Sequence, residues 1–464
     1  MAAENRPNIL FFFPDQHRAD WLGSFHRLPL KTPNLDRLAA EGVLFNDCVT
    51  PSPLCAPARA CLAAGKEYDR CRTPSNGENF PLDETTVYAL LRNGGYHVMG
   101  CGKFDLAKAL HDWDLHGKRR LDEWGFSDGI DNEGKWDGIN SGRDTAKGPY
   151  MHYLEQKQLK DVHVQDFDRR RKTGKDATFP TPLPEEAYCD NWVAQNGLDL
   201  LRRAPAERPW FLQVNFTGPH DPWDITGSML DAVRGRTGFP PPVQNEQFDP
   251  ETHRRIRRNY AAMIENIDRW IGRYCTFLEE TGQRENTLIV YSSDHGEMLG
   301  DHGQWGKSCA YHGAVGVPLI IAGPGVRSGQ TCRAPATILD LAATFLDWAN
   351  LPVPRDMDSI SLKPILAGTT DRSRTVVQSG LDSWRAVYDG RYKLIRGRNG
   401  QKAPDRRGPF RLYDRENDPG ETRNVAGDHP EIVRRLAPLL PAEGQRPNPE
   451  TPEATPATPG KPGT

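Results

Sequence analysis

The chain has 464 residues, of which 37% are apolar, and its formal net charge is −3. This length allows roughly two to four domains, or one long α/β domain with a smaller companion. The near-neutral charge gives no general electrostatic reason to bind nucleic acid or an anionic membrane. No apolar run has the length needed to cross a bilayer.

The N-terminal segment has the pattern of a buried strand and not of a secretion leader. Its apolar part, residues 9–13, is too short for a signal-peptide core and is followed by no small-residue cleavage site. We therefore expect a cytoplasmic protein. The nine cysteines are scattered and contain no CxxC pair, which argues against disulfides and against a cysteine-based zinc site.

Short apolar runs alternate with helical patterns along most of the chain. Strands are expected at residues 8–13, 96–100, 210–216, 287–292 and 317–322. Helices are expected from Thr32, as the capping residue, to Gly42, at residues 85–91, and at residues 256–278, where apolar residues repeat at helical spacing. This alternation predicts an α/β fold with a largely parallel sheet.

The remaining segments differ in composition from this alternating pattern. Residues 107–185 and 224–250 are rich in Gly and in charged residues or Pro, and we predict long loops that shape the substrate pocket. After residue 372, short strands are expected at 384–388, 392–396 and 410–413, with a helix near 429–440. We predict a catalytic α/β domain at 1–371, a smaller C-terminal domain at 372–441 and a disordered tail at 442–464.

Acidic and histidine side chains follow two of the predicted strands, where ligands bind in open α/β sheets. Asp15 and Gln16 follow the first strand, and Asp294 and His295 follow the fourth. Two carboxylates and an imidazole suit Ca²⁺, Mg²⁺ or Mn²⁺, and Gln16 could add an amide oxygen. Each aspartate alone could equally cap a helix, but together they favour a metal site.

Four cationic or proton-donating residues accompany the same strand ends: Arg59, Lys103, His220 and Lys307. A sulfate or phosphate ester needs such groups as negative charge builds on its leaving oxygen. Taken singly, each lysine could be solvated and His220 could be a turn residue. Their common position near the predicted metal site favours an anion-binding role.

The segment SPLCAPAR, residues 52–59, places Cys55 at a predicted helix N-terminus, where backbone N–H groups stabilise a thiolate. The motif Cys55-x-Pro57-x-Arg59 also resembles the signature of sulfatases, whose cysteine is oxidised to formylglycine. Further blocks extend the resemblance to the sulfatase family of the alkaline phosphatase superfamily: residues 8–16, 94–103, 218–222, 293–297 with Lys307, and 410–421.

The resemblance implies a mixed, mostly parallel sheet sandwiched by helices, with a smaller C-terminal α+β domain that contains a short antiparallel sheet. It implies one divalent metal, Ca²⁺ first with Mn²⁺ or Mg²⁺ as alternatives. The implied metal ligands are Asp15, Gln16, Asp294, His295 and the formylglycine made from Cys55. The implied catalytic residues are Cys55, Arg59, Lys103, Asp105, His220 and Lys307.

The resemblance also implies a role for each catalytic residue. Formylglycine-55 would be the nucleophile, Arg59 would steady its hydrate, and the two lysines with His220 would bind the sulfate oxygens. His220 or Lys307 would protonate the leaving alcohol. Attack on sulfur would give a covalent sulfated hydrate, and elimination would release sulfate and regenerate the aldehyde.

Two positions depart from the common pattern of the family. Asp15-Gln16 replaces an Asp-Asp pair, as is typical of the branches that act on choline sulfate or phosphonate monoesters. Asp105 stands where the family usually has a histidine that takes the proton driving elimination. We hypothesise that Asp105 is this base; the alternative is that it binds a cationic or hydroxylated part of the substrate.

We thus predict a sulfatase for a small-molecule or saccharide sulfate ester, with a formylglycine-generating enzyme as its maturation partner. The alternatives are a phosphonate or phosphate ester hydrolase, a catalytically silent binding homologue, and an unmodified thiolate enzyme. The oligomeric state stays open. Candidate substrate contacts are Trp113, His116, Trp136, His163 and Trp223, and the basic run 169–172 could attract a polyanion, although a solvated charge run is the simpler interpretation.

Overall fold

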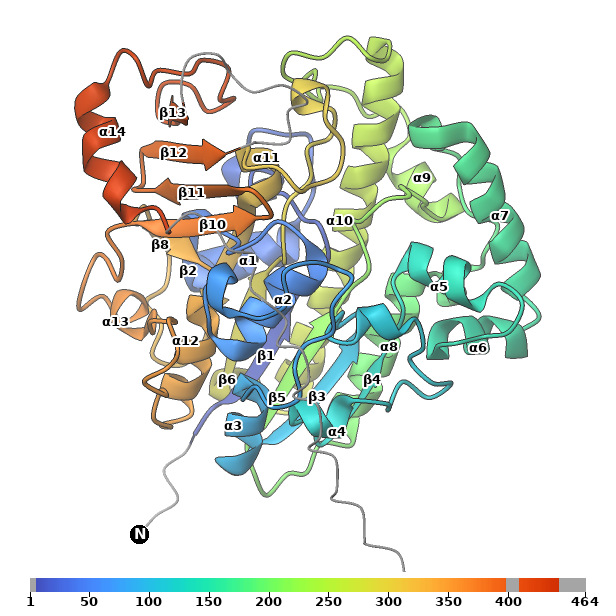
Figure 1. Ribbon diagram of the computed structural model, residues 1–464. Helices are drawn as coiled ribbons and strands as arrows, with labels where there is room; N and C mark the ends of the chain where they lie inside the picture. The colour runs from blue at the N-terminus through green and yellow to red at the C-terminus, as the bar shows by residue number, and fades with distance from the viewer. Residues whose placement is uncertain (1–5, 398–408, 442–464) are drawn as a thin grey trace, which may run out of the picture.

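The computed structural model describes residues 6–397 and 409–441, so the predicted tail lies outside the described residues (Figure 1). Within these ranges a nine-stranded sheet forms the centre of the molecule. Its strands, in spatial order, are β4 (Asp128–Asp131), β3 (His97–Gly102), β5 (Trp210–Asn215), β1 (Asn8–Phe12), β6 (Thr287–Ser292), β7 (Gly316–Ala322), β2 (Val43–Val49) and β8 (Gln330–Cys332), and β9 (Ala336–Thr337) pairs with β2.

Strand direction determines where the polar strand ends meet. β7 runs antiparallel to β6 and β2, whereas the other pairings described in this sheet are parallel. The C-terminal ends of β1, β3, β5 and β6 therefore share one edge with the start of β7. This arrangement confirms the mixed, mostly parallel sheet, and it brings the loop between β6 and β7 to the same edge.

Helices cover both faces of the large sheet (Figure 1). One face packs against α2 (Cys55–Ala64), α3 (Val87–Asn93) and α12 (Asp340–Trp348), and the other against α1 (Pro33–Glu41), α8 (Cys189–Arg202) and α10 (Pro250–Glu280). Alternate side chains of β1 divide between the two cores, Ile9 and Phe11 in the first, Leu10 and Phe12 in the second. Each such burial contributes about 1.5–3 kcal/mol, which is why this strand is apolar from Ile9 to Phe12.

The predicted helix start at Thr32 is confirmed, but its capping interaction is not. The Thr32 hydroxyl accepts no hydrogen bond from a backbone N–H in the first turn of α1. It accepts instead from the backbone N–H of Gly23 at 2.9 Å and donates to Asp36 Oδ1 at 3.1 Å. The hydroxyl therefore joins a preceding turn to the helix.

Residues 107–185 do not form the long loop that their composition predicted. They contain β4 and the helices α4 (Leu121–Trp124), α5 (Lys135–Gly142), α6 (Pro149–Gln156) and α7 (Lys160–Thr173). The apolar periodicity of α7 is weak because its buried face mixes Phe167 with His163, Asp166 and Arg170. Arg170 is buried because it pairs with Asp166 at 2.8 Å. Residues 224–250 likewise contain a helix, α9 (Gly227–Val233).

A second sheet of four antiparallel strands forms in the C-terminal region, at the upper left of Figure 1. Its strands are β10 (Val377–Leu381), β11 (Trp384–Tyr388), β12 (Tyr392–Gly397) and β13 (Phe410–Asp414), and α14 (Pro430–Leu436) follows them. Two short helices, α11 (His312–Val315) and α13 (Lys363–Leu366), precede this sheet. The small antiparallel sheet is confirmed, with β10 as an unpredicted fourth strand; the boundary at residue 371 stays a prediction.

The small sheet holds the segment that follows Lys307. The backbone N–H of His312 donates to Glu421 Oε2 at 2.7 Å, and Glu421 also pairs with the buried Lys393 of β12. Lys393 in turn donates to the Ala310 carbonyl. The C-terminal signature block therefore has a structural role, because it fixes the loop between β6 and β7.

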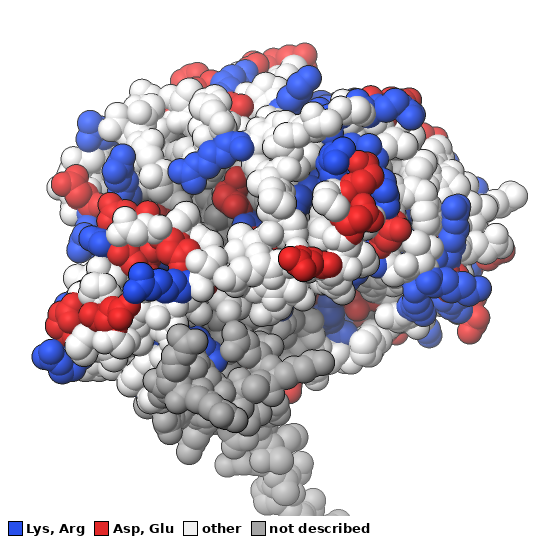
Figure 2. All heavy atoms as spheres, turned by 90° about the horizontal axis from the view of Figure 1, so that it is seen from above, with Lys and Arg blue, Asp and Glu red and all other residues white. Residues whose placement is uncertain are grey.

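The outer surface carries both signs of charge. On the face in Figure 2, lysine and arginine side chains are interspersed with aspartate and glutamate side chains. None of the helices in residues 6–397 and 409–441 combines the length and apolar character that a membrane span requires. The nine cysteines are all buried and unbridged in the described structure.

Candidate active site

The structure brings the predicted site residues together at the shared strand edge. Their side chains come from six places: the ends of β1, β3, β5 and β6, the first turns of α2, and the loop between β6 and β7, which carries Lys307. Neither Asp15 nor Asp294 opens a helix, so the capping alternative is not supported. The buried members are Asp15, Gln16, Cys55, Arg59, Lys103, Asp105, Asp294 and His295, and His220 and Lys307 are partly exposed.

Four of these residues are arranged as a metal site. One potential ligand atom each from Asp15, Cys55, Asp294 and His295 lies within 4.8 Å of the others. Two carboxylate oxygens, an imidazole nitrogen and the position-55 side chain form a donor set that suits a hard divalent cation. The buried carboxylates need positive charge beside them, so the residues present fit the predicted metal.

Cys55 begins α2, with its side chain inside the metal cluster. Its Sγ atom lies 3.2 Å from His295 Nε2 and 3.9 Å from Asp15 Oδ1. Burial and the neighbouring Asp15 raise the pKa of the Cys55 thiol. Lys103, Lys307 and His295 lower it by more, so the resulting pKa lies well below its ordinary value. The helix N-terminus and the neighbouring cations therefore favour negative charge on the side chain at position 55.

Arg59 lies one turn after Cys55 and connects the metal cluster to β3. Its Nε donates to Asp294 Oδ2 at 3.0 Å, and a second guanidinium nitrogen donates to the Lys103 carbonyl at 2.6 Å. A weaker contact of 3.4 Å reaches Asp15. The i, i+4 spacing of the motif thus places Cys55 in the cluster and Arg59 against the carboxylates of the cluster.

Two lysines and a histidine surround the other side of the cluster. Lys103 pairs with Asp15, and its Nζ lies 2.9 Å from Asp105. Lys307 Nζ lies 2.6 Å from Gln16 Oε1 and 2.6 Å from His220 Nε2. Burial raises the pKa of Asp15. Lys103, His220 and Lys307 together lower it by more, so the resulting pKa lies well below its ordinary value. These neighbours therefore favour the ionised form of the Asp15 carboxylate.

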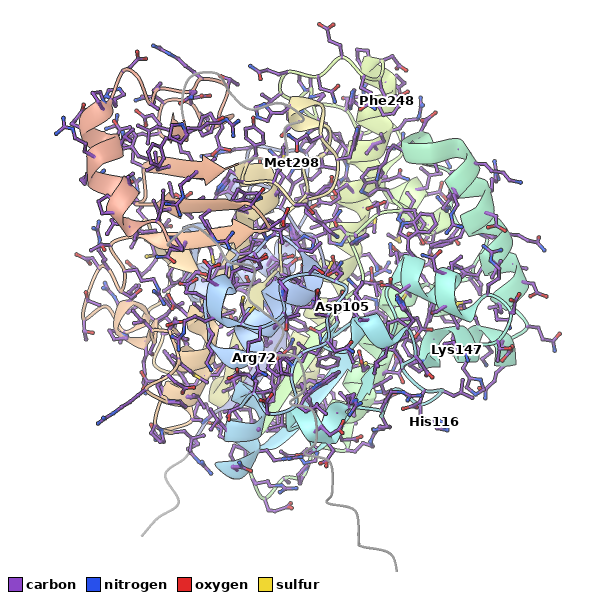
Figure 3. The ribbon with its side chains drawn as sticks, in the orientation of Figure 1. Arg72, Asp105, His116, Lys147, Phe248 and Met298 are labelled. Carbon is purple, nitrogen blue, oxygen red and sulfur yellow. The ribbon has the colours of Figure 1, made fainter. Side chains whose placement is uncertain are left out.

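Asp105 lies beside the cluster near the centre of the molecule (Figure 3). It is fully buried, and its Oδ2 atom pairs with Lys103 at 2.9 Å and with Lys108 at 3.0 Å. Lys108 also reaches Asp137 of α5 at 2.6 Å. The other oxygen, Asp105 Oδ1, has no hydrogen-bond partner among the described residues, which leaves it free to accept a proton or a substrate donor.

Glu297 is a buried site residue to which no role was assigned from the sequence. Its carboxylate accepts from the Gln16 side chain, from the backbone N–H of Leu299 at 2.9 Å and from that of Gly306 at 2.6 Å. It therefore orients the Gln16 amide and the turn before Lys307. Glu297 is the last residue of the conspicuous block 293–297, so the sequence could have suggested a role for it. The local sequence does not show that the backbone of Gly306 folds back onto Glu297.

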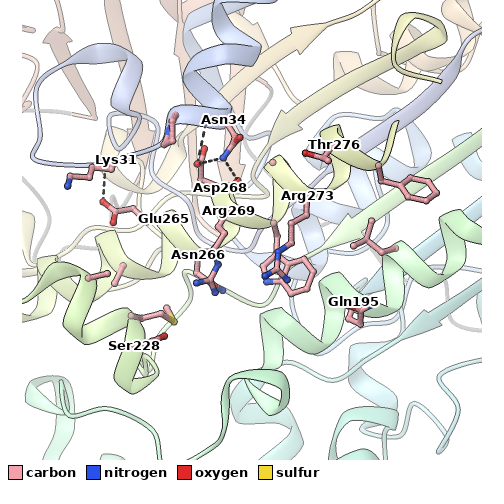
Figure 4. A pocket seen from close by; sticks show the side chains of 18 of the residues that line it. Lys31, Asn34, Gln195, Ser228, Glu265, Asn266, Asp268, Arg269, Arg273 and Thr276 are labelled. Atoms are coloured by element: carbon pink, nitrogen blue, oxygen red, sulfur yellow. Dashed lines mark hydrogen bonds between the residues drawn. The ribbon is translucent and has the colours of Figure 1, made fainter. Parts of the chain in front are cut away.

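A separate hollow lies away from this site. It has a volume of about 770 Å³ and runs along α10 beside α8 and α9 (Figure 4). Some of its polar groups bond to one another: Asn34 Nδ2 donates to Asp268 Oδ2 at 2.9 Å, and the Lys31 backbone N–H donates to Glu265 at 2.8 Å. None of the strand-end residues line it.

Comparisons with known proteins identify the family. The family model described as Sulfatase matches residues 7–351, and a model described as N-sulphoglucosamine sulphohydrolase, C-terminal, matches residues 300–441. An N-acetylglucosamine-6-O-sulfatase of Bacteroides thetaiotaomicron is 27% identical, covering 91% of this chain and 83% of its own length. A choline-sulfatase of Rhizobium meliloti is 28% identical, covering 91% and 82%.

Solved structures give the same fold. The phosphonate monoester hydrolase of Agrobacterium radiobacter superposes with a TM-score of 0.77 at 24% identity, and the match covers 94% of each chain. The Sulfatase family model spans most of the chain, and the buried cluster and the motif at the start of α2 agree with it. The chain belongs to the sulfatase family, within the alkaline phosphatase superfamily.

Proposed function

We propose that the protein hydrolyses the sulfate ester of a saccharide or other small alcohol, with a nucleophile made by oxidising Cys55 to formylglycine and with one divalent metal, Ca²⁺ first. The observation that carries the proposal is the position of Cys55. It is 1% exposed, begins α2, and shares a cluster with two carboxylates and an imidazole. A structural cysteine gains nothing from such a polar cluster.

The side chains around position 55 form two groups, one proposed to hold the metal and one proposed to bind the sulfate group. Asp15, Asp294 and His295 would hold the metal, which supplies Lewis-acid stabilisation and orients the ester. Lys103, His220 and Lys307 would bind the sulfate oxygens and oppose the charge that builds on the leaving oxygen. Since Lys307 Nζ and His220 Nε2 lie 2.6 Å apart, a proton on either can pass to the leaving alcohol.

The nearest alternative on this scaffold is a phosphonate or phosphate ester hydrolase. Gln16 is neutral where many sulfatases have a second aspartate, so the cluster has one negative charge fewer. A catalytically silent homologue is disfavoured, because both metal carboxylates, both lysines and the intact Cys55–Arg59 motif are retained in contact.

Esters of one alcohol should separate sulfate from phosphorus chemistry. We expect kcat/KM for 4-nitrophenyl sulfate to exceed that for 4-nitrophenyl phosphate and for the matched phenylphosphonate monoester by at least about tenfold, or about 1.4 kcal/mol of transition-state stabilisation. Release of nitrophenolate measures all three rates in one preparation. A faster phosphonate or phosphate ester would assign the protein to the alternative.

Asp105 is proposed as the base that drives the last step. In Asp105→Asn the first half of the reaction should proceed, because Lys103, His220 and Lys307 are unchanged. We expect a burst of about one equivalent of alcohol followed by turnover reduced on the order of 10²-fold or more. Rapid-quench measurement of alcohol release shows the burst. Full multiple-turnover activity in this variant would show that another group removes the proton.

A further inference from the structure

A pocket of about 310 Å³ lies beside His220, outside the metal cluster. Its walls come from α5, from the end of α7 with the following turn, and from the loop after β5. The side chains used below are Trp136, Arg170, Arg171, Lys175, Asp221 and Trp223. Its volume is near the lower end of the roughly 300–1,000 Å³ typical of small-molecule sites, so it suits one ring.

One wall residue of this pocket, Asp221, adjoins the groups proposed to bind and protonate the ester. Asp221 directly follows His220, whose Nε2 lies 2.6 Å from Lys307 Nζ. Burial raises the pKa of Asp221. His220, Lys175 and Lys307 together lower it by more, so the resulting pKa lies below its ordinary value. The pocket wall therefore lies within the electrostatic reach of the groups proposed to bind and protonate the ester.

The helix that carries Trp136 is fixed against this wall. Lys135 Nζ donates to the carbonyls of His220 at 3.2 Å and Pro222 at 3.3 Å, and pairs with Asp224 at 2.7 Å. Trp223 in turn packs on Trp305, two residues before Lys307, with ring centroids 5.6 Å apart. These contacts hold two walls of the pocket in place relative to His220 and Trp305.

Cationic side chains outnumber anionic ones in the pocket. Arg170 is neutralised by Asp166 at 2.8 Å, and Lys175 by Asp221 at 3.1 Å. Arg171 donates to the neutral Asn140 Oδ1 at 2.7 Å and forms no ion pair within residues 6–397 and 409–441. One positive charge therefore remains available to a ligand, which disfavours a cationic alcohol and favours an anionic one.

The aromatic walls add a platform for a ring. The Arg171 guanidinium lies 5.3 Å from the centre of the Trp136 ring, and Lys175 Nζ lies 5.4 Å from that of Trp223. The Trp223 side chain is 2% exposed, and its Nε1–H has no acceptor among the described residues. A buried indole N–H without a partner is costly, so a hydroxyl or anionic oxygen of a ligand would stabilise it.

We propose that this pocket binds the alcohol part of the substrate, and that this part is a sugar ring with a second anionic group, a carboxylate or a further sulfate. Arg171 recognises the anion, and Trp136 and Trp223 contact the ring. The identity of the pocket as the alcohol site rests on the proposed function; its preference for anionic sugars does not.

Binding can be measured without turnover, which separates the two proposals. Two pairs of sugars differ by one charge: methyl glucuronide against methyl glucoside for a carboxylate, and glucosamine N-sulfate against N-acetylglucosamine for a sulfate. We expect the full-length protein to bind at least one charged sugar about tenfold more tightly than its neutral partner in calorimetry or saturation-transfer NMR. Arg171→Gln should reduce this ratio to near one.

Lys172→Gln is the matched control, because Lys172 is exposed on the same helix, adjacent to Arg171, and does not line the pocket. It should keep the wild-type ratio. Equal binding of charged and neutral sugars by the wild-type protein would overturn the inference, and so would an equal loss in both variants. Hydrolysis of 4-nitrophenyl sulfate reports separately on the proposed function, because that ester has no sugar.

Discussion

Replacing Cys55 by alanine is expected to lower kcat for any sulfate ester on the order of 10⁴-fold or more, because the proposed nucleophile is lost. In the active wild-type protein the peptide that contains Cys55 should be lighter by about 18 Da, the difference between a thiol and an aldehyde at that carbon. Cys55 lies 3.2 Å from His295, inside the metal cluster, so its loss cannot be compensated from elsewhere in α2.

Cys61→Ala is the matched control for this experiment. Cys61 is also buried in α2, but it packs in the apolar core against one face of the sheet and has no part in the cluster. Its replacement should leave kcat within a few-fold and the mass of the Cys55 peptide unchanged. An unmodified thiol at Cys55 in a fully active preparation would contradict the formylglycine proposal and support a thiolate enzyme.

Replacing Asp294 by asparagine is expected to weaken metal binding at least about 100-fold and to reduce kcat/KM by a similar factor. The substitution removes the negative charge of one of the two carboxylates in the cluster, and with it the ion pair with Arg59 at 3.0 Å. Metal content after gel filtration measures the loss independently of activity. In the wild-type protein, excess metal should raise the thermal midpoint, since saturation at about 100 Kd stabilises the fold by about 2.7 kcal/mol.

Asp340→Asn separates a metal effect from a general loss of stability. Asp340 is also fully buried and pairs with an arginine, Arg374, at 2.6 Å, but it lies in α12 and outside the cluster. Its replacement should lower the free energy of unfolding and leave metal content unchanged. Equal metal content in Asp294→Asn and the wild-type protein would remove Asp294 from the ligand set.

The central strands and the strand-end residues were predictable because burial dictates both. A strand covered on two faces is mostly apolar, as β1, β5 and β6 are, so its approximate limits are visible in the sequence. The first charged residue after such a run lies at the sheet edge. This is why Asp15, Asp294 and His295 could be grouped before their contacts were known.

Other parts could not be predicted because their partners are distant in the chain. β2 was missed because it contains Asn46 and Asp47, and its pairing with β7 shifts register between Phe45 and Cys48. α7 was missed because a buried ion pair replaces part of its apolar face. The contact of Lys108 with Asp137 depends on α5 packing against the loop after β3.

The burial of Cys55 has a consequence for timing. At 1% exposure its side chain is closed to any enzyme that would oxidise it, so a modification there must precede completion of the fold. The loop with Lys307 is secured only when Glu421 reaches His312, and 366 residues separate Cys55 from Glu421. At a synthesis rate of about 5–20 residues per second, this leaves about 20–70 seconds in which Cys55 has been made and the contact that completes its site has not.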